Sequence, residues 1–341
     1  MATVPGVGMR VAVVGAGSWG TTVSALCCKN TDTVLWARRK ELADELATEH
    51  TNESYLPGVR LPQELSATCD LEEAVSSADV VVMAVPSHGF RSVLGEVADH
   101  VRPWVPVISL SKGLEQGTNK RMTEVVNDVL PDHPAGILTG PNLAREVAVG
   151  YPAAAVVAMA DARMARALRP VFAGPAFLVF TNLDIIGCEL AGVVKNVLAI
   201  AAGMVDGMGF GDNTKATLLT RGLTEMTRLG VALGGQPLSF SGLAGMGDLV
   251  ATCSSSQSRN HRVGEELGKG RRLEEIVGEM NMVAEGVKSS RVVAALAATH
   301  DVEMPIAEQV EAVCHRGVDA RDAMSSLMAR RAGSEFWGIA Q

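Results

Sequence analysis

Lys195 is the residue whose sequence surroundings most directly indicate a catalytic role. It lies in AGVVKNVLAIAAG, an apolar run at helical spacing, with small residues three and four positions away. Desolvation lowers the pKa of a lysine and brings its amine into the range useful for general acid–base catalysis. The alternative is a structural lysine with a buried stem whose amine reaches water.

Asp248 and Thr252 form a second polar feature within SGLAGMGDLVATCSSS. Their spacing of four places both side chains on one face of a helix. The glycines before Asp248 permit close backbone packing, so its carboxylate is able to orient or pair with a catalytic lysine. The alternative is an aspartate in the first turn of a helix, stabilised by the helix dipole.

Four further residues favour the binding of a ligand. Ser258 is a helix N-cap candidate, and the helix N-terminus together with Arg259 predicts a phosphate site. Lys112 follows the apolar run PVISL, and Gly140 follows GILT. Both positions are expected at the carboxyl ends of parallel strands, where open α/β sheets bind ligands.

A dinucleotide fingerprint follows the first apolar run. The string Gly15-Ala16-Gly17-Ser18-Trp19-Gly20 fits G-x-G-x-x-G and opens a predicted helix. In this pattern the first glycine permits a tight turn, the second lets a pyrophosphate approach the backbone, and the third lets helix and strand pack closely. The alternative is a glycine turn that binds no ligand.

The residues after the second predicted strand bear on the choice of cofactor. An acidic residue there binds the ribose 2′-hydroxyl of NAD, but this chain has Arg38 and Arg39. Two guanidinium groups are suited to pairing with a 2′-phosphate. We therefore predict that NADP(H) is accepted and favoured over NAD(H). The alternative is that both arginines are solvated surface charges.

The elements that must hold these residues fall into two classes. The first part alternates short apolar runs with helical patterns, which predicts a Rossmann-type, doubly wound parallel sheet. From about Asp184 onward long helical patterns dominate, which predicts an all-α C-terminal domain. The expected domains are residues 1–184 for NAD(P) and 185–341 for substrate and catalysis. Strands are expected at 10–14, 33–37, 79–85, 106–110, 136–139, 153–160 and 177–181, and glycine- and serine-rich loops at 203–211 and 251–258.

Several strings in this order resemble the bacterial type of NAD(P)-dependent sn-glycerol-3-phosphate dehydrogenase. They are GAGSWGT, AVPSHGFR, SLSKGLE, LTGPNLAREV, ELAGVVKNVLAIAAGMVDGMGFGDNTKA and SGLAGMGDLVATCSSSQSRNHRVG, and they span nearly the whole chain. The resemblance implies reversible reduction of dihydroxyacetone phosphate to sn-glycerol 3-phosphate, which supplies glycerophospholipid synthesis.

The resemblance also implies a role for each matching position. Lys195 would be the acid–base group, with Asp248 and Thr252 completing the catalytic set. The substrate would contact Lys112, Gly140, Lys195, Asp248, Ser258, Arg259 and Asn260. The cofactor would contact Gly15, Gly17, Ser18, Trp19, Gly20, Arg38, Arg39, Lys112, Ala144, Arg259, Val283 and Glu285.

Two other functions are compatible with parts of the pattern. One is a ketopantoate- or 6-phosphogluconate-type dehydrogenase, which also carries a Lys-Asn motif but is not expected to combine it with the SRN string. The other is a non-catalytic redox sensor that binds NADPH. Such a sensor would need the glycine fingerprint without the combination of Lys195, Asp248 and Arg259.

Composition excludes several classes of protein. The 341 residues hold 30 Lys and Arg against 38 Asp and Glu, a net charge of −8, which argues against a nucleic-acid partner. The six cysteines form no C-x-x-C pair, and no metal cluster is visible, so we expect reduced thiols and no metal. The N-terminus has no signal-peptide pattern, and charged residues interrupt the apolar run 185–205. We expect a cytoplasmic homodimer without a membrane span.

Overall fold

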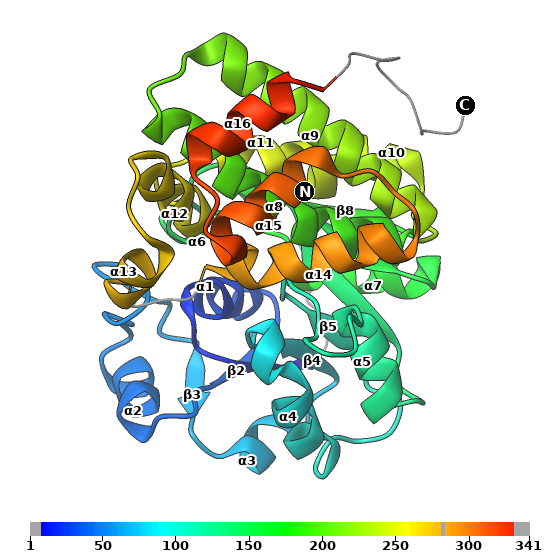
Figure 1. Ribbon diagram of the computed structural model, residues 1–341. Coiled ribbons are helices and arrows are strands. Elements are labelled where there is room, and N and C mark those ends of the chain that lie inside the picture. The colour runs from blue at the N-terminus through cyan, green and yellow to red at the C-terminus, as the bar shows by residue number, and fades with distance from the viewer. Residues whose placement is uncertain (1–7, 281–283, 331–341) are drawn as a thin grey trace. The chain divides into compact units, whose positions relative to one another are not determined.

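The computed structural model describes residues 8–280 and 284–330 (Figure 1). Contacts within the chain divide it into two compact units, Met1–Ile185 and Ile186–Gln341. The first unit is built on a β-sheet and the second consists of helices.

The first unit contains one eight-stranded sheet in the order β3-β2-β1-β4-β5-β6-β7-β8. The strand order reverses direction between β1 and β4, the topological switch point at which doubly wound sheets bind ligands. The strands are β1 (Arg10–Val14), β2 (Asp32–Trp36), β3 (Ser66–Thr68), β4 (Val80–Met83), β5 (Val107–Ser109), β6 (Ala135–Thr139), β7 (Ala153–Met159) and β8 (Phe177–Asn182).

Both faces of the sheet are covered, which explains why its strands are continuously apolar. Successive side chains of β1 belong to different cores: Val11 and Val13 to one, Ala12 and Val14 to the other. A strand buried on both faces has no solvent-exposed positions that would favour polar residues. The covering helices are α1 (Ser18–Cys27), α2 (Lys40–Thr48), α3 (Leu71–Val75), α4 (Ser87–Ala98), α5 (Met122–Val129), α6 (Ala144–Ala148) and α7 (Ala162–Phe172).

The predicted Rossmann-type sheet is confirmed, but its last two strands run against the others. β6 and β7 pair antiparallel, with Ile137 opposite Ala158, whereas β7 and β8 are parallel to each other. The prediction of a purely parallel sheet was therefore wrong at this edge. The segment that connects them, residues 140–152, contains only the five-residue α6, and an apolar strand carries no sequence signal of its direction.

The second unit confirms the predicted helical half. Its helices are α8 (Ile185–Gly207), α9 (Asp212–Ala232), α10 (Pro237–Ser241), a π-helix η1 (Leu243–Gly247), α11 (Asp248–Ser254), α12 (Arg259–Gly268), α13 (Leu273–Gly278), α14 (Glu285–Thr299), α15 (Pro305–Arg316) and α16 (Ala320–Met328). The two segments expected to be loops, 203–211 and 251–258, are partly helical. Residues 203–207 complete α8 and 251–254 complete α11, because packing of these small residues overrides their weak helix propensity.

Helix α8 is the centre of the second unit. Every residue from Gly187 to Val205 is buried, including Glu189, Lys195 and Asn196. By length and hydropathy α8 would pass for a membrane-crossing helix, but 89% of its most apolar window is buried within the fold. A core helix that is apolar all round has the same composition.

Candidate active site

The glycine-rich turn after β1 has the geometry of a pyrophosphate cradle. Gly15 has φ +118°, and a Cβ there would lie 2.7 Å from the backbone oxygen of Ala84. A Cβ on Gly20 would lie 2.0 Å from the oxygen of Gly15, so the third glycine permits the close approach of helix and strand. A Cβ on Gly17 would meet nothing within 4 Å, which leaves the backbone there open to a ligand. Helix α1 begins at Ser18, and Trp19 is its second residue.

Arg38 and Arg39 follow β2 and are exposed. The Cζ atom of Arg38 lies 5.9 Å from the centre of the Trp36 ring, and that of Arg39 lies 5.8 Å from the centre of the Tyr55 ring. These cation–π contacts favour defined positions for the two guanidinium groups without neutralising them. Among the described residues, neither arginine forms an ion pair with a carboxylate.

The ends of β5 and β6 bring Lys112 to Gly140. The Nζ atom of Lys112 donates a hydrogen bond to the Gly140 oxygen at 2.9 Å. Gly140 has φ +139°, and a Cβ there would lie 3.1 Å from the Ala154 oxygen, so a side chain would be strained as well as crowded. Ala144, the first residue of α6, accepts a hydrogen bond from Thr22 of α1 at 3.2 Å. That bond joins the segment after β6 to the helix of the cradle.

Buried polar atoms in the first unit support a bound ligand at this region. Trp19 Nε1, Thr139 Oγ1 and both side-chain polar atoms of Asn142 are buried and have no hydrogen-bond partner among the described residues. Buried polar groups normally have partners, and a nucleotide or phosphorylated substrate offers both donors and acceptors. The residues present therefore fit a dinucleotide. Sequence reasoning placed the segment after β6 at the ligand-binding edge but assigned no role to the side chains of Thr139 and Asn142.

Lys195, Asp248 and Thr252 form a buried polar cluster in the second unit. The Nζ atom of Lys195 lies 3.0 Å from Asp248 Oδ1 and 2.6 Å from Thr252 Oγ1. The Thr252 hydroxyl lies 3.2 Å from the same Asp248 oxygen. The side chains of Lys195 and Asp248 are only 7% and 2% exposed. Burial strengthens this ion pair, so the carboxylate favours the ammonium form of the lysine.

Helix α12 begins with the predicted SRN string. Ser258 is its N-cap, and its Oγ accepts a hydrogen bond from the backbone N–H of His261 at 3.2 Å. The next residue is Arg259, at the first position of the helix. Burial lowers the pKa of its guanidinium, and the nearby carboxylate of Glu285 opposes that shift. A helix N-terminus and an arginine are thus present together, as a phosphate site requires.

The Asn260 side chain joins three helices. Its Nδ2 donates to Asn196 Oδ1 of α8 at 2.9 Å, and its Oδ1 accepts the backbone N–H of Gly286 of α14 at 2.9 Å. The backbone N–H of Gly286 is only a donor, which fixes the orientation of the amide. Sequence reasoning placed Asn260 at the substrate but missed Asn196 and Gly286, since neither link follows from local spacing.

The predicted site residues therefore form two groups. Gly15, Gly17, Ser18, Trp19, Gly20, Arg38, Arg39, Lys112, Gly140 and Ala144 belong to the first unit, and Lys195, Asp248, Thr252, Ser258, Arg259, Asn260 and Glu285 belong to the second. Val283, a predicted cofactor contact, lies outside the described residues. The described residues include no cluster of His, Cys, Asp and Glu suited to a metal ion.

Both halves of the chain match models of one family. A model described as NAD-dependent glycerol-3-phosphate dehydrogenase N-terminus matches residues 10–165, and the corresponding C-terminus model matches residues 184–325. A glycerol-3-phosphate dehydrogenase (NAD(P)+) 2 of Sphingopyxis alaskensis is 57% identical over 96% of this chain and 98% of its own. The Mycobacterium avium protein named glycerol-3-phosphate dehydrogenase (NAD(P)+) is 52% identical over 96% of this chain and 97% of its own.

Solved structures agree with these sequence matches. The crystal structure of glycerol-3-phosphate dehydrogenase from Coxiella burnetii has a TM-score of 0.90 and 38% identity, and the match covers 95% of this chain and 99% of that one. A ketopantoate reductase from Ralstonia eutropha has a TM-score of 0.58 and 15% identity, over 93% of this chain and 100% of that one. The second likeness concerns the fold alone.

Proposed function

Because the chain belongs to the NAD-dependent glycerol-3-phosphate dehydrogenase family, we infer that its two groups of site residues serve the reaction of that family. The protein is an NAD(P)-dependent oxidoreductase that reversibly reduces dihydroxyacetone phosphate to sn-glycerol 3-phosphate. Its product is the backbone of glycerophospholipids, which is consistent with a role in lipid synthesis. We propose that residues 1–184 bind the cofactor and that residues 185–341 bind substrate and carry the acid–base group.

The buried amine of Lys195 is the observation that supports this mechanism. As the ketone is reduced, negative charge develops on the oxygen at C2, and Lys195 is the group proposed to protonate it. Asp248 favours the ammonium form that must give up this proton, and Thr252 fixes the direction of the amine. A bound nicotinamide supplies the hydride in reduction and accepts it in oxidation.

The remaining site residues are proposed to bind and orient the two ligands. Arg259 and the N-terminus of α12, with Ser258 and Asn260, are proposed to hold the substrate phosphate. Lys112 and Gly140 of the first unit are further proposed substrate contacts. This remote binding energy orients the carbon that reacts. The glycine turn with Ser18 and Trp19, the Arg38–Arg39 pair, Ala144, Arg259, Val283 and Glu285 are proposed to bind the cofactor.

Replacing Lys195 tests the mechanism. Lys195→Ala is expected to lower kcat about 10³-fold, the range for a lost general acid, while NADPH binding measured by fluorescence titration is retained. Lys269→Ala is the matched control, because that lysine is an exposed surface residue in the same unit. Turnover of Lys195→Ala within a few-fold of the parent would exclude Lys195 as the acid–base group.

We propose that NADPH is favoured over NADH. Support comes from the two exposed arginines after β2, where no acidic residue is present to bind a ribose 2′-hydroxyl. Initial rates with dihydroxyacetone phosphate should favour NADPH. The double variant Arg38→Ala with Arg39→Ala should raise the KM for NADPH about 10-fold more than that for NADH. The reason is that it removes the charge-assisted bonds to the 2′-phosphate, a group that only NADPH carries. Equal increases for both cofactors would contradict this preference.

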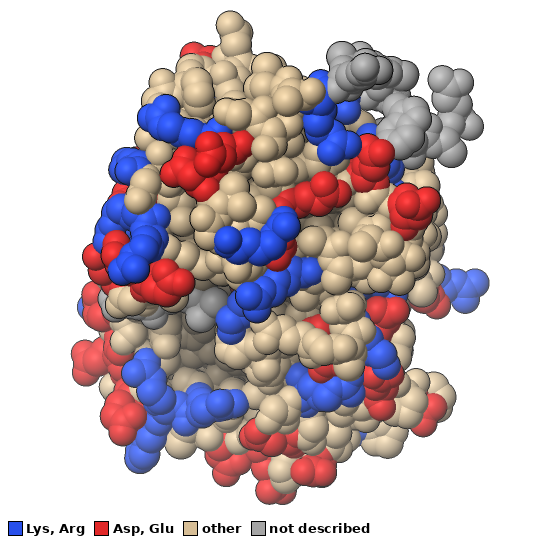
Figure 2. Space-filling model, viewed as in Figure 1, with Lys and Arg blue, Asp and Glu red and all other residues tan. Residues whose placement is uncertain are grey.

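We further propose that the enzyme is a homodimer and acts in the cytoplasm, as the apolar helical half and the sequence pattern led us to expect. Light scattering coupled to size exclusion measures the mass in solution, and a monomer at micromolar concentration would contradict the proposed dimer. Figure 2 shows basic and acidic side chains interspersed on the face in view.

A further inference from the structure

The loop between β5 and α5, residues 110–121, positions Lys112. Its near end is attached to β4, because the Leu110 N–H donates to the Met83 oxygen at 2.9 Å and the Ser111 hydroxyl donates to the Val85 oxygen. Lys112 follows directly and reaches the Gly140 oxygen. The position of its amine therefore depends on how the rest of the loop is held.

The C-terminal part of the loop, residues 115–120, is a turn held by its own backbone hydrogen bonds. The Glu115 N–H donates to the Lys120 oxygen at 2.9 Å, and the Asn119 N–H donates to the Glu115 oxygen at 3.0 Å. Gly117 and Asn119 have φ values of +87° and +59°, in the left-handed region. These bonds shape the turn but do not attach it to a helix. Its attachment comes from side chains.

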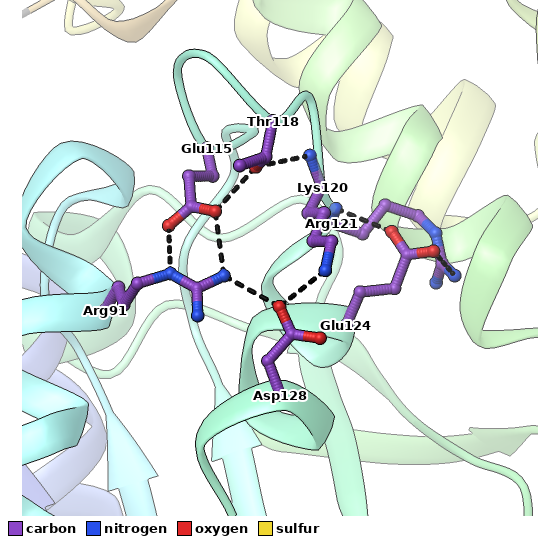
Figure 3. A network of polar contacts seen from close by, with 7 residues as sticks. All are labelled: Arg91, Glu115, Thr118, Lys120, Arg121, Glu124 and Asp128. Atoms are coloured by element: carbon purple, nitrogen blue, oxygen red, sulfur yellow. Dashed lines mark hydrogen bonds and ion pairs between the residues drawn. The ribbon is translucent and has the colours of Figure 1, made fainter.

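Arg91 of α4 makes that attachment (Figure 3). Its guanidinium forms two parallel bonds with the Glu115 carboxylate, from Nε to Oε1 at 2.7 Å and from Nη2 to Oε2 at 2.9 Å. The same Nη2 reaches Asp128 Oδ2 of α5 at 2.8 Å, and Lys120 Nζ binds that oxygen at 2.6 Å. Thr118 donates a further bond to Glu115 at 2.5 Å. One arginine thus joins the loop to both neighbouring helices.

The charges of this network balance. Two cations, Arg91 and Lys120, face two carboxylates, Glu115 and Asp128. The Arg91 guanidinium lowers the pKa of Glu115, and Lys120 and Arg91 together lower that of Asp128, so both carboxylates stay ionised well into the acid range. The Glu115 side chain is only 14% exposed. An isolated surface ion pair contributes little, but a bidentate pair within a network fixes geometry.

We propose that Arg91 is a positioning residue for the reaction: by binding Glu115 and Asp128 together, it fixes the loop that places Lys112 beside Gly140. Arg91 touches neither ligand in this proposal and acts through Lys112. The proposal therefore rests on the substrate- and cofactor-binding role proposed above for Lys112. Displacing a binding residue by about 1 Å can cost up to about 100-fold in rate.

Kinetics of four variants test this role. Arg91→Ala and Glu115→Gln should each lower kcat/KM for dihydroxyacetone phosphate about 10-fold, mainly through KM, since the acid–base group is untouched. The double variant should be no worse than either single variant, because both substitutions remove the same attachment. Arg91→Lys keeps the charge but loses the two-pronged contact, so it should restore the activity only in part.

Hydrogen exchange provides a readout of the loop itself. Without ligands, a peptide covering residues 110–121 should exchange faster in Arg91→Ala, because the N–H groups of Glu115 and Asn119 lose protection. Arg102→Ala is the matched control: this exposed arginine pairs with Asp79 at 2.6 Å, at the opposite end of β4. That variant should keep kcat/KM within about twofold and leave the exchange of the loop unchanged.

The reference variant Lys112→Ala separates the two proposals. If it retains the full kcat/KM, the role of Lys112 fails and the role of Arg91 fails with it. If Lys112→Ala loses activity while Arg91→Ala and Glu115→Gln stay within twofold of the parent, only the role of Arg91 is overturned. An equal loss in Arg102→Ala would also overturn it, by showing a general effect of surface charge. Glu115→Gln alone decides the question should Arg91→Ala not fold.

Discussion

Asp248 and Thr252 hold the amine of Lys195 from one short helix, and this arrangement has a measurable electrostatic consequence. The Asp248 carboxylate, 3.0 Å from Nζ and 2% exposed, favours the ammonium form. Asp248→Asn removes that charge and should lower the pKa of the acid group. The alkaline limb of the kcat/KM profile for reduction should then move to lower pH.

A steady-state pH profile between 5.5 and 9.5 measures this shift. Asp212→Asn serves as the control, because Asp212 is an exposed residue in the first turn of α9. An unchanged alkaline limb in Asp248→Asn would show that the carboxylate does not tune the acid group of the reaction.

The Asn260 amide leads to a second prediction at the scale of single residues. Asn260→Ala removes the side-chain bonds to Asn196 Oδ1 and to the backbone N–H of Gly286, both at buried positions. We expect a loss of stability of about 1 to 3 kcal/mol and a rise of about 10-fold in the KM for dihydroxyacetone phosphate. Chemical denaturation and steady-state rates measure both, with exposed Asn213→Ala as the control. An unchanged KM would limit Asn260 to a structural role.

The local features of the Lys195 cluster were predictable from sequence, whereas contacts between distant residues were not. Lys195 within an apolar helical run, and the spacing of four between Asp248 and Thr252, are local patterns. Asn196 and Asn260 are 64 positions apart, and their contact depends on the packing of α8 against α12. Thr139 and Asn142 stand out only once burial shows that their polar atoms have no partner among the described residues.

Helices α8 and α12 approach each other at glycines, and this contact sets the distance between Lys195 and the SRN string. A Cβ on Gly203 would lie 2.0 Å from the His261 oxygen, and one on Gly264 would lie 2.0 Å from the Ile200 oxygen. Backbone atoms at that distance leave no space for even a methyl group. The two helices would have to move apart to admit one.

Gly203→Ala should therefore destabilise the protein by about 1 to 3 kcal/mol, despite the higher helix propensity of alanine. Activity should fall as well, because the SRN string moves relative to Lys195. Gly278→Ala is the control: a Cβ there meets nothing within 4 Å. Thermal unfolding and kcat/KM measure both effects. A Gly203→Ala protein as stable and active as the control would contradict the tight packing.

At the scale of elements, sequence periodicity predicted the strands buried on both faces and the long helices. The periodicity did not indicate that β7 and β8 run opposite to β1–β6, because a continuously apolar strand has the same pattern in either direction. The strand β3 has only three residues and alternates too briefly to be recognised. The π-helix η1 lies directly before α11. Its glycines have low helix propensity, so propensity alone predicts a loop there.

At the scale of the whole molecule, a buried carboxylate couples stability to pH. Glu225 of α9 is 3% exposed and accepts the N–H groups of Ile306 and Ala307 at the start of α15. These bonds and Arg228 favour the charged form, but burial outweighs them and raises the pKa of Glu225 from 4.5 to about 7. The folded state therefore holds a proton between pH 4.5 and 7 that the unfolded chain releases.

The sign of the effect follows from that shift. Because the folded pKa lies above the unfolded one, the contribution of Glu225 is complete below about pH 4.5 and is lost as the pH rises through 7. Glu225→Gln removes this titration. The fall in the free energy of unfolding between pH 5 and 8 should be smaller in this variant, by up to about 3 kcal/mol. Urea denaturation followed by circular dichroism at four pH values measures the slope.

Glu279→Gln is the matched control for this prediction. Its carboxylate is exposed, and Arg271 lowers its pKa below the ordinary range of a glutamate, so the slope of Glu279→Gln between pH 5 and 8 should match that of the parent. If Glu225→Gln also follows the parent slope, the carboxylate is not a source of pH dependence. A flatter slope in Glu225→Gln alone would trace the loss of stability between pH 5 and 8 to one carboxylate at the α9–α15 contact.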